Sequence, residues 1–408
     1  MPAETLERVV REEWGRLIAL LLAESRRLDL VEDALADAVE AAARRWPADG
    51  PPSNPQAWLL TAARRRIVDR LRAEAIHRRK APLLITDAAG EQEVRPAREP
   101  TPEEELLQLV ILCAHPALTR ASASALALRL VLGVTTADIA RLFLVPEPTV
   151  AARLTRAKKK IITAGIPFGS VGASDLPARL DGVAETAYLA FTAGYAPGSG
   201  PDLLRTDLAG EAIRLARVCL RLCPGEPALV ALVALMLVQH SRRDARVDAE
   251  GHLVVLADQD RSRWHTDEIA EARALLAHPA LRAPVGALAA SYALQAAIGA
   301  EHAAAESAAV TRWDRIVALY DQLLRVAPTP AARLARAVAV GEASGPEAGL
   351  AAMAGELPAN HRTPAVRAEL LARAGRPEAA RAAFDDALRR CDNAAERDHL
   401  ERRRAALP

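Results

Sequence analysis

The side chains with the clearest chemical potential lie between residues 134 and 160, in VTTADIARLFLVPEPTVAARLTRAKKK. This stretch holds six Lys or Arg residues against two acidic ones, Asp138 and Glu147, together with several Thr and Ala residues. Guanidinium and ammonium groups bind phosphates and guanine, and small side chains allow close approach to base edges. The chemistry that this composition indicates is recognition of nucleic acid, not catalysis.

Two helices are needed to position these side chains. Thr136 is the expected N-cap of ADIARLF, whose Ile139, Ala140 and Phe143 are expected to face inward. The turn LVPE follows, and Pro148 falls in the first turn of the next helix, where proline is tolerated. One stripe of that second helix is apolar: Val150, Leu154, Ala157 and Ile161. We therefore predict a helix-turn-helix whose second helix enters a major groove. A basic solvated helix is the alternative, but it leaves the proline-marked turn and the clustered cations unexplained.

A second group of cations follows Trp58 on another expected helix, where Trp58, Ala62, Ile67 and Leu71 are predicted to face the core. Only Asp69 and Glu74 oppose this group, which consists of Arg64, Arg65, Arg66, Arg70, Arg72, Arg78, Arg79 and Lys80. Alone, such a run is usually a solvated surface. Two basic helices joined by a linker are able to engage separate parts of one duplex.

The densest polar stretch elsewhere is ADQDRSRWHTDE, residues 257 to 268. Its six singled-out residues are Asp258, Gln259, Asp260, Arg261, Arg263 and Trp264. They are open to three interpretations: a catalytic cluster, an internal salt-bridge network, or an interface. No nucleophile–base pair, phosphate loop or metal spacing accompanies them, which favours the network or interface over catalysis. Cys113 and His115 supply only two potential metal ligands, so we expect Cys113 to be a core residue.

The composition predicts an all-α protein. The chain has 408 residues, of which 51% are hydrophobic and only 3% aromatic, and its net charge is +1. Chains rich in Ala, Leu and Arg and poor in aromatic residues favour helices over sheets. The N-terminus has no apolar signal segment, and the longest apolar run, residues 228 to 238, is too short to span a bilayer. We expect a soluble, cytoplasmic protein of two or three domains, with no cofactor or metal.

The C-terminal half contains a weak helical repeat. Gly375 follows one expected helix, and Ala380, Phe384 and Ala387 then show the spacing of tetratricopeptide helix pairs. A partial echo begins at Pro346, which corresponds to Pro377. An irregular helical bundle is the alternative. In the N-terminal half we expect two helices over residues 6 to 46 and a loop at 47 to 55; Leu30, Ala34, Ala38 and Ala41 form the apolar side of the second helix.

Taken in order, LVEDALADAVEAAARRWP, NPQAWLLTAARRRIVDRLR and TTADIARLFLVPEPTVAARLTRAKK resemble an extracytoplasmic-function (ECF) RNA polymerase sigma factor. The further segments LADQDRSRW and TRWDRIVALYDQLL resemble the subgroup with a tetratricopeptide-like C-terminal extension, the ECF42-type factors. The resemblance implies sigma region 2 at 1–82, a linker at 83–102, and sigma region 4 at 103–165. A second linker at 166–182 and a helical regulatory domain at 183–408 follow.

The resemblance also implies roles for individual residues. Asp33 and Asp37 correspond to the surface that binds the β′ clamp of core polymerase, and region 4 is expected to contact the β flap. The residues expected at the −10 element are Arg64, Arg65, Arg66, Asp69 and Arg72. The residues expected at the −35 element are Thr149, Arg153, Arg156 and Lys159. Ala151 and Ala152 stand where the family often has Lys and Ser, so the −35 contact should depend more on groove shape and phosphates.

The expected function is therefore a non-enzymatic, alternative sigma factor. It binds core polymerase and promoter DNA and is regulated in cis by its C-terminal domain, without a separate anti-sigma factor. One alternative is a one-component helix-turn-helix regulator with a ligand-sensing C-terminal half. An enzyme with a DNA-binding appendage is a third class, against which the missing catalytic constellation argues.

Overall fold

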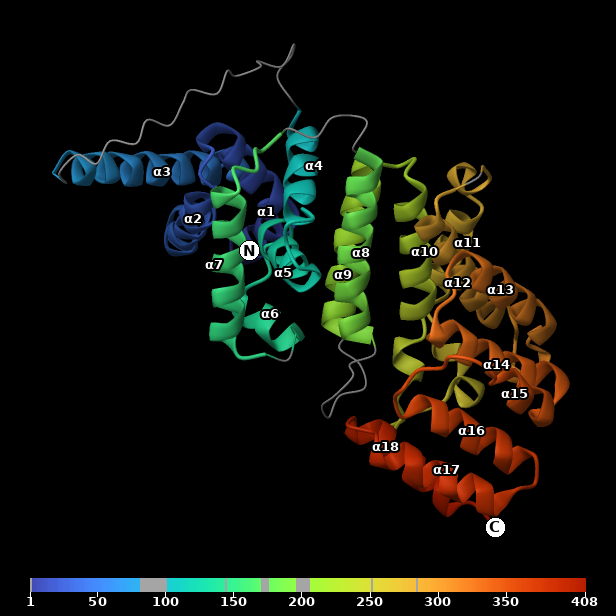
Figure 1. Ribbon diagram of the computed structural model, residues 1–408. Coiled ribbons are helices and arrows are strands. Elements are labelled where there is room, and N and C mark those ends of the chain that lie inside the picture. The colour runs from blue at the N-terminus through green and yellow to red at the C-terminus, as the bar shows by residue number, and fades with distance from the viewer. Residues whose placement is uncertain are drawn as a thin grey trace. The chain divides into compact units, whose positions relative to one another are not determined.

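In the computed structural model the chain is built of α-helices joined by turns and short 3₁₀ segments (Figure 1). The structure describes residues 2–80, 101–143, 145–169, 176–195, 206–250, 252–283 and 285–408. Within these ranges the only β-type pairing is an isolated bridge between Val247 and Leu253, which confirms the all-α prediction. The chain divides into two compact units, Met1–Thr186 and Ala187–Pro408. Each is described by itself.

Among the described residues, seven helices lie wholly in the first unit, and an eighth spans the boundary at Thr186. Their bounds are α1 Pro2–Ser25, α2 Leu28–Asp49, α3 Pro55–Lys80, α4 Pro102–Cys113, α5 Arg120–Leu130, α6 Thr136–Phe143, α7 Glu147–Thr163 and α8 Leu176–Tyr195. Helix α1 packs against α2, α3 and α4. The predicted regions 2 and 4 therefore lie against each other in one unit. Residues 83–100 of the first predicted linker and 170–175 of the second lie outside the described residues, as do the last two residues of predicted region 2.

The N-terminal helices follow their expected stripes with small shifts. On α2, Leu30, Ala34 and Ala38 are buried as predicted, but the next buried position is Ala42 and not Ala41. The predicted loop at 47–55 is too long, because α2 continues through Pro47 to Asp49. Pro47 lies in the last turn, so the hydrogen bond that its missing N–H cannot make interrupts only the end of the helix.

On α3 the buried stripe is one position away from the prediction at its start. Leu59, Ala63 and Ile67 are buried, whereas Trp58, Ala62 and Leu71 are only half-buried. Trp58 instead packs edge-on against Trp46 of α2, with ring centroids 5.7 Å apart. A tryptophan is long enough to fill the margin between two helices, which leaves the contact at the helix axis to smaller residues.

The second unit is also helical. Its elements after α8 are α9 Thr206–Leu222, α10 Pro227–His240, α11 Thr266–Leu276, α12 Ala287–Ala304, α13 Trp313–Val326, α14 Pro330–Ser344, α15 Pro346–Ala352, α16 Arg362–Arg373, α17 Pro377–Arg389 and α18 Ala394–Ala405. Helix α10 carries the apolar run and is buried almost all round, packed by α9, α11 and α12. Among the described residues no helix has the length and apolar character needed to cross a membrane.

The predicted repeat signature describes a real helix pair. Helix α16 ends at Arg373, and Gly375 then adopts a φ of +72°, a conformation that glycine reaches without strain. On α17, Ala380, Phe384 and Ala387 are all buried against α16, as the spacing predicted. The echo is shorter: Pro346 and Pro377 both lie at helix starts, but α15 has seven residues and α17 has thirteen.

Candidate nucleic-acid interface and the C-terminal unit

Helices α6 and α7 form the predicted helix-turn-helix. The inward positions Ile139 and Ala140 are buried, and Phe143 is half-buried. All four residues of the predicted stripe on α7 are buried: Val150, Leu154, Ala157 and Ile161. Pro148 lies in the first turn of α7, as expected. The N-cap prediction is wrong by one residue. Thr135 caps α6, accepting from the Asp138 amide at 3.0 Å, and Thr136 is the first helical residue.

The opposite face of α7 is exposed and basic. Thr149, Arg156 and Lys159 are exposed, as are Ala151 and Ala152. Arg153 is half-buried, with its guanidinium carbon 6.0 Å from the centre of the Phe143 ring. Within the described ranges Lys159 has no acidic partner. Helix α7 therefore presents small residues and cations in the arrangement that a major groove accepts.

The arginines predicted at the −10 element project from α3. Arg64 donates from Nε to Glu24 of α1 at 2.8 Å, and Asp69 lies 3.8 Å from Arg72 on the same helix. Arg65 is exposed, and among the described residues it has no ion pair. These side chains share one exposed helix, and Arg64 pairs with α1 whereas Asp69 and Arg72 pair with each other.

The two carboxylates predicted to bind polymerase pair with α3. Asp33 lies 3.2 Å from Nη1 of Arg70, and Asp37 lies 3.6 Å from Nη2 of the same arginine. Arg66 approaches Asp37 at 4.0 Å. Carboxylates expected to bind polymerase therefore lie beside an arginine expected to bind DNA, Arg66. These ion pairs are exposed and weak, so binding of polymerase or of DNA would break them at little cost.

A buried ion-pair cluster that the sequence pattern does not reveal is centred on Glu32. Its side chain is 9% exposed, accepts from Arg129 Nε of α5 at 2.5 Å and also pairs with Lys158 of α7. Burial opposes ionisation of Glu32, but Lys158 and Arg129 outweigh it, so its pKa lies below the ordinary value. Glu32 therefore links α2 of predicted region 2 with α7 of predicted region 4.

Trp14 of α1 completes this junction. Its indole Nε1 donates to the Arg129 carbonyl at 3.1 Å, and the Arg129 guanidinium lies 5.7 Å from the centre of the Trp14 ring. Gly133, with a φ of +71°, lies so close to that ring that an added Cβ would come within 2.8 Å of it. The contact between α1 and the segment after α5 therefore requires glycine.

In the second unit, the polar stretch 257–268 forms a turn that is held by hydrogen bonds to its own backbone and to the segment after α12. Asp260 caps the 3₁₀ segment Arg261–Arg263 by accepting from the Ser262 amide at 2.9 Å. Arg261 donates to the Ala305 carbonyl after α12 at 2.7 Å and lies 4.8 Å from the centre of the buried Trp264 ring. Gln259 is buried and donates to the Val254 carbonyl, whereas Asp258 and Arg263 are exposed. This geometry supports the interpretation as an internal network.

The network continues into histidines to which the sequence assigned no role. Glu268 of α11 lies 2.9 Å from Nδ1 of His240 and 2.9 Å from Nη1 of Arg243. Arg243 also lies 3.0 Å from Nδ1 of His265, whose Nε2 is 2.7 Å from Asp244. Burial alone would raise the pKa of Glu268, but His240 and the neighbouring cations outweigh it. The pKa of Glu268 therefore lies below its ordinary value. The group holds the start of α11 against the end of α10.

A cavity of about 700 Å³ lies in the second unit among α13, α14, α16 and α18. Its lining is mainly apolar and includes Trp313, Tyr320 and Val338. Two of its arginines form ion pairs within the protein: Arg403 donates from Nε to Glu369 at 2.7 Å, and Arg373 pairs with Glu342. A cavity of this size accommodates a small organic molecule.

Cys113, which the sequence offers with His115 as a potential metal ligand, is a fully buried core residue, as expected.

Comparisons with known proteins give two family matches and one relative of nearly full length. Residues 108–161, which include α6 and most of α7, match the family described as "Sigma-70, region 4". Residues 179–280 match a "Family of unknown function (DUF6596)". An uncharacterized protein of Rhizobium meliloti (strain 1021) is 40% identical over 386 residues, which cover 93% of this chain and 90% of that protein. No solved structure matches the chain.

Proposed function

Because the chain belongs to the same family as the Rhizobium meliloti protein and contains a sigma-70 region 4, we propose that it is an alternative sigma factor of the ECF type. It binds core RNA polymerase and directs initiation at promoters with particular −35 and −10 elements. The observation that carries the proposal is the helix-turn-helix of α6 and α7, which lies within the matched region 4 and exposes a basic face. Sigma factors position polymerase without chemistry of their own, so we propose that the protein is not an enzyme.

The proposed contacts follow the exposed faces. The −35 element is contacted by Thr149, Arg153, Arg156 and Lys159. The −10 element is contacted by Arg64, Arg65, Arg66, Asp69 and Arg72. Polymerase binds Asp33 and Asp37 through its β′ clamp, and region 4 through its β flap. In this proposal the second unit is a tetratricopeptide-like domain that regulates the first in cis, from the same cytoplasmic chain, without a separate anti-sigma factor.

Promoter binding requires the first unit to open. The names of the two elements place them about 25 base pairs apart, which is roughly 85 Å along B-DNA at 3.4 Å per base pair. Yet Glu32 of α2 pairs directly with Lys158 of α7. Regions 2 and 4, held together by this pair, cannot contact the −10 and −35 elements at the same time. We therefore propose that the arrangement described here is a closed form, from which region 4 separates when polymerase binds.

Transcription with purified components tests the proposal. The chain should co-purify with core polymerase, and the complex should give discrete run-off transcripts on genomic DNA. Arg153→Ala and Arg66→Ala should reduce these transcripts without loss of core binding, whereas Arg44→Ala, an exposed cation on α2, should change neither. Failure to bind core polymerase under any condition would refute the proposal.

The alternative function, a one-component regulator with a ligand-sensing C-terminal half, is favoured by one observation, the apolar cavity of the second unit. Such a regulator binds a specific duplex tightly without polymerase, and its affinity changes with a small ligand. An electrophoretic mobility assay with the isolated chain separates the two functions. Regulation in cis is tested by removing residues 206–408; unchanged transcription and unchanged core binding would contradict it.

A further inference from the structure

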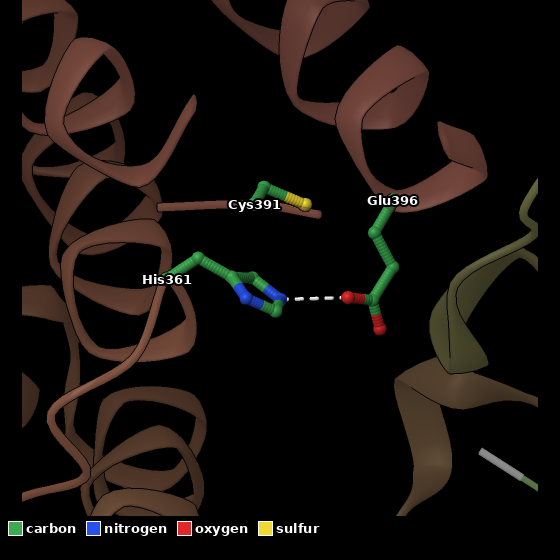
Figure 2. Close-up of side chains that lie close together, drawn as sticks. All are labelled: His361, Cys391 and Glu396. Atoms are coloured by element: carbon green, nitrogen blue, oxygen red, sulfur yellow. Dashed lines mark ion pairs between the residues drawn. The ribbon is translucent and has the colours of Figure 1, made fainter. Parts of the chain in front are cut away.

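Three side chains with metal-binding chemistry converge near the C-terminal end of the second unit. His361 is the residue before α16, Cys391 follows α17, and Glu396 lies in the first turn of α18 (Figure 2). One ligand atom from each lies within 4.8 Å of the other two. The spacing of His361 and Cys391 in the sequence does not predict this cluster, because the ends of three separate helices bring the groups together.

The three groups suit a borderline transition-metal ion. Imidazole nitrogen, thiolate sulfur and carboxylate oxygen are the donors that zinc uses, at about 2.0–2.3 Å. Around a tetrahedral ion such atoms lie roughly 3.3–3.8 Å apart by that geometry. The His361 Nε2 to Glu396 Oε2 distance is 2.6 Å, so these two side chains would part slightly to admit an ion. Movements of this size need only side-chain rotation.

The surroundings prepare the ligands. Arg362 lies 3.3 Å from Oε1 of Glu396, which leaves Oε2 directed at His361, as Figure 2 shows for that pair. A partner on the second oxygen favours monodentate ligation and fixes the carboxylate. Asn393 caps α18 by accepting from the Glu396 amide at 3.0 Å, so the first turn holds the carboxylate in place.

Charge and burial also fit. A thiolate and a carboxylate together cancel the charge of a divalent ion, which lowers the electrostatic cost of burying the ion. Cys391 is fully buried, and the side chains of His361 and Glu396 are 15% and 24% exposed, so one side of the cluster reaches solvent. A water molecule is therefore able to complete a tetrahedral shell from that side.

We propose that His361, Cys391 and Glu396 bind one divalent ion of the zinc class, with water as the fourth ligand. The ion fastens the start of α16 and the start of α18 to the end of α17. It thereby supports the cluster of Phe384, Ala387 and Leu400 beside it. The proposal is independent of the sigma-factor function, since it depends only on the second unit.

Cobalt(II) added to the full-length, reduced chain tests this directly, because cobalt replaces zinc and gives a near-ultraviolet band when a thiolate coordinates it. One equivalent should bind with this band, and zinc should displace it. Cys391→Ser should abolish the band, and His361→Gln or Glu396→Gln should weaken binding at least about tenfold. Cys223→Ser, a half-buried thiol elsewhere, should leave both unchanged.

A second control addresses the other candidate cluster of the described residues, Asp248, Glu250 and His252, which contains no thiol. Asp248→Asn should leave the cobalt band intact. Circular dichroism without metal establishes that each variant is folded, and zinc should raise the melting temperature of the wild type but not of Cys391→Ser. The proposal is overturned if the wild type gives no stoichiometric band, if Cys391→Ser keeps it, or if both His361→Gln and Glu396→Gln bind as the wild type does.

Discussion

Replacing Glu32 with Gln should loosen the contact between α2 and α7. The change keeps the shape of the side chain but removes the counter-ion shared by Arg129 and Lys158, whose side chains are only 15% and 18% exposed. Breaking a buried ion pair by removing one partner typically costs about 3–5 kcal/mol. Gln still accepts a hydrogen bond, and the lysine stem is flexible enough to reach water. We therefore expect about 2–3 kcal/mol, which is roughly 30- to 150-fold in an opening equilibrium.

Hydrogen exchange on the full-length chain measures this opening. Peptides from α7, Glu147–Thr163, and α2, Leu28–Asp49, should exchange faster in Glu32→Gln, whereas peptides from α17 should not change. Glu40→Gln is the matched control, because Glu40 lies on the same helix in an exposed pair with Arg44. Equal exchange in Glu32→Gln and Glu40→Gln would refute the assignment of Glu32 as the link between the two regions.

The same carboxylate gives a pH dependence of defined sign. The pKa of Glu32 in the folded chain lies below its ordinary value of 4.5, so folding favours the ionised form. Its contribution is complete above that ordinary value and is lost as the pH falls toward the lower folded value. The difference in opening between the wild type and Glu32→Gln should therefore be constant near neutral pH and shrink below about 4.5. A difference that grows on acidification would contradict the pairing.

Three further changes test other parts of the structure. Lys159→Ala should lower the salt dependence of promoter binding by the polymerase complex by about 0.9 in log–log slope, one phosphate contact, while Arg44→Ala leaves it unchanged; an unchanged slope in Lys159→Ala removes that residue from the interface. Gly133→Ala should destabilise the first unit by more than Gly50→Ala, because both have a positive φ but only Gly133 abuts an indole ring; thermal melts that match would refute this. Phe384→Ala should cost the second unit about 3–5 kcal/mol in denaturant unfolding, since its ring is fully buried.

Periodicity within a single helix predicted the all-α fold and the buried face of α7 well. The four buried residues of α7 were all predicted, and the repeat spacing singled out three of the four buried residues of α17, because each stripe repeats over several turns. The exposed basic face of α7 follows from the same pattern. The sequence therefore contains enough information to orient a helix whose apolar side is sharply defined.

Smaller errors arise where neighbouring positions compete. Ala42 is buried in place of Ala41, and Leu59 and Ala63 in place of Trp58 and Ala62. Successive helical residues differ by about 100° around the axis, so a modest rotation of the helix exchanges adjacent margins. That rotation is decided by the partner helix, which the local sequence does not specify. The capping error at Thr135 and Thr136 has a similar origin, because either hydroxyl suits the pattern.

Glu32 shows what local sequence omits, since its partners lie 97 and 126 residues away. It also complicates the proposed polymerase surface. Asp33 pairs with α3 and its neighbour Glu32 with α7, so separation of region 4 would add a third carboxylate beside Asp33 and Asp37. If that surface binds polymerase, Glu32→Gln has two opposing effects. It destabilises the closed form, and it removes one of the three carboxylates that polymerase would contact. The affinity for core polymerase then changes less than the opening equilibrium does. Lys158→Met destabilises the closed form but keeps all three carboxylates, so this variant should bind core polymerase more tightly than Glu32→Gln.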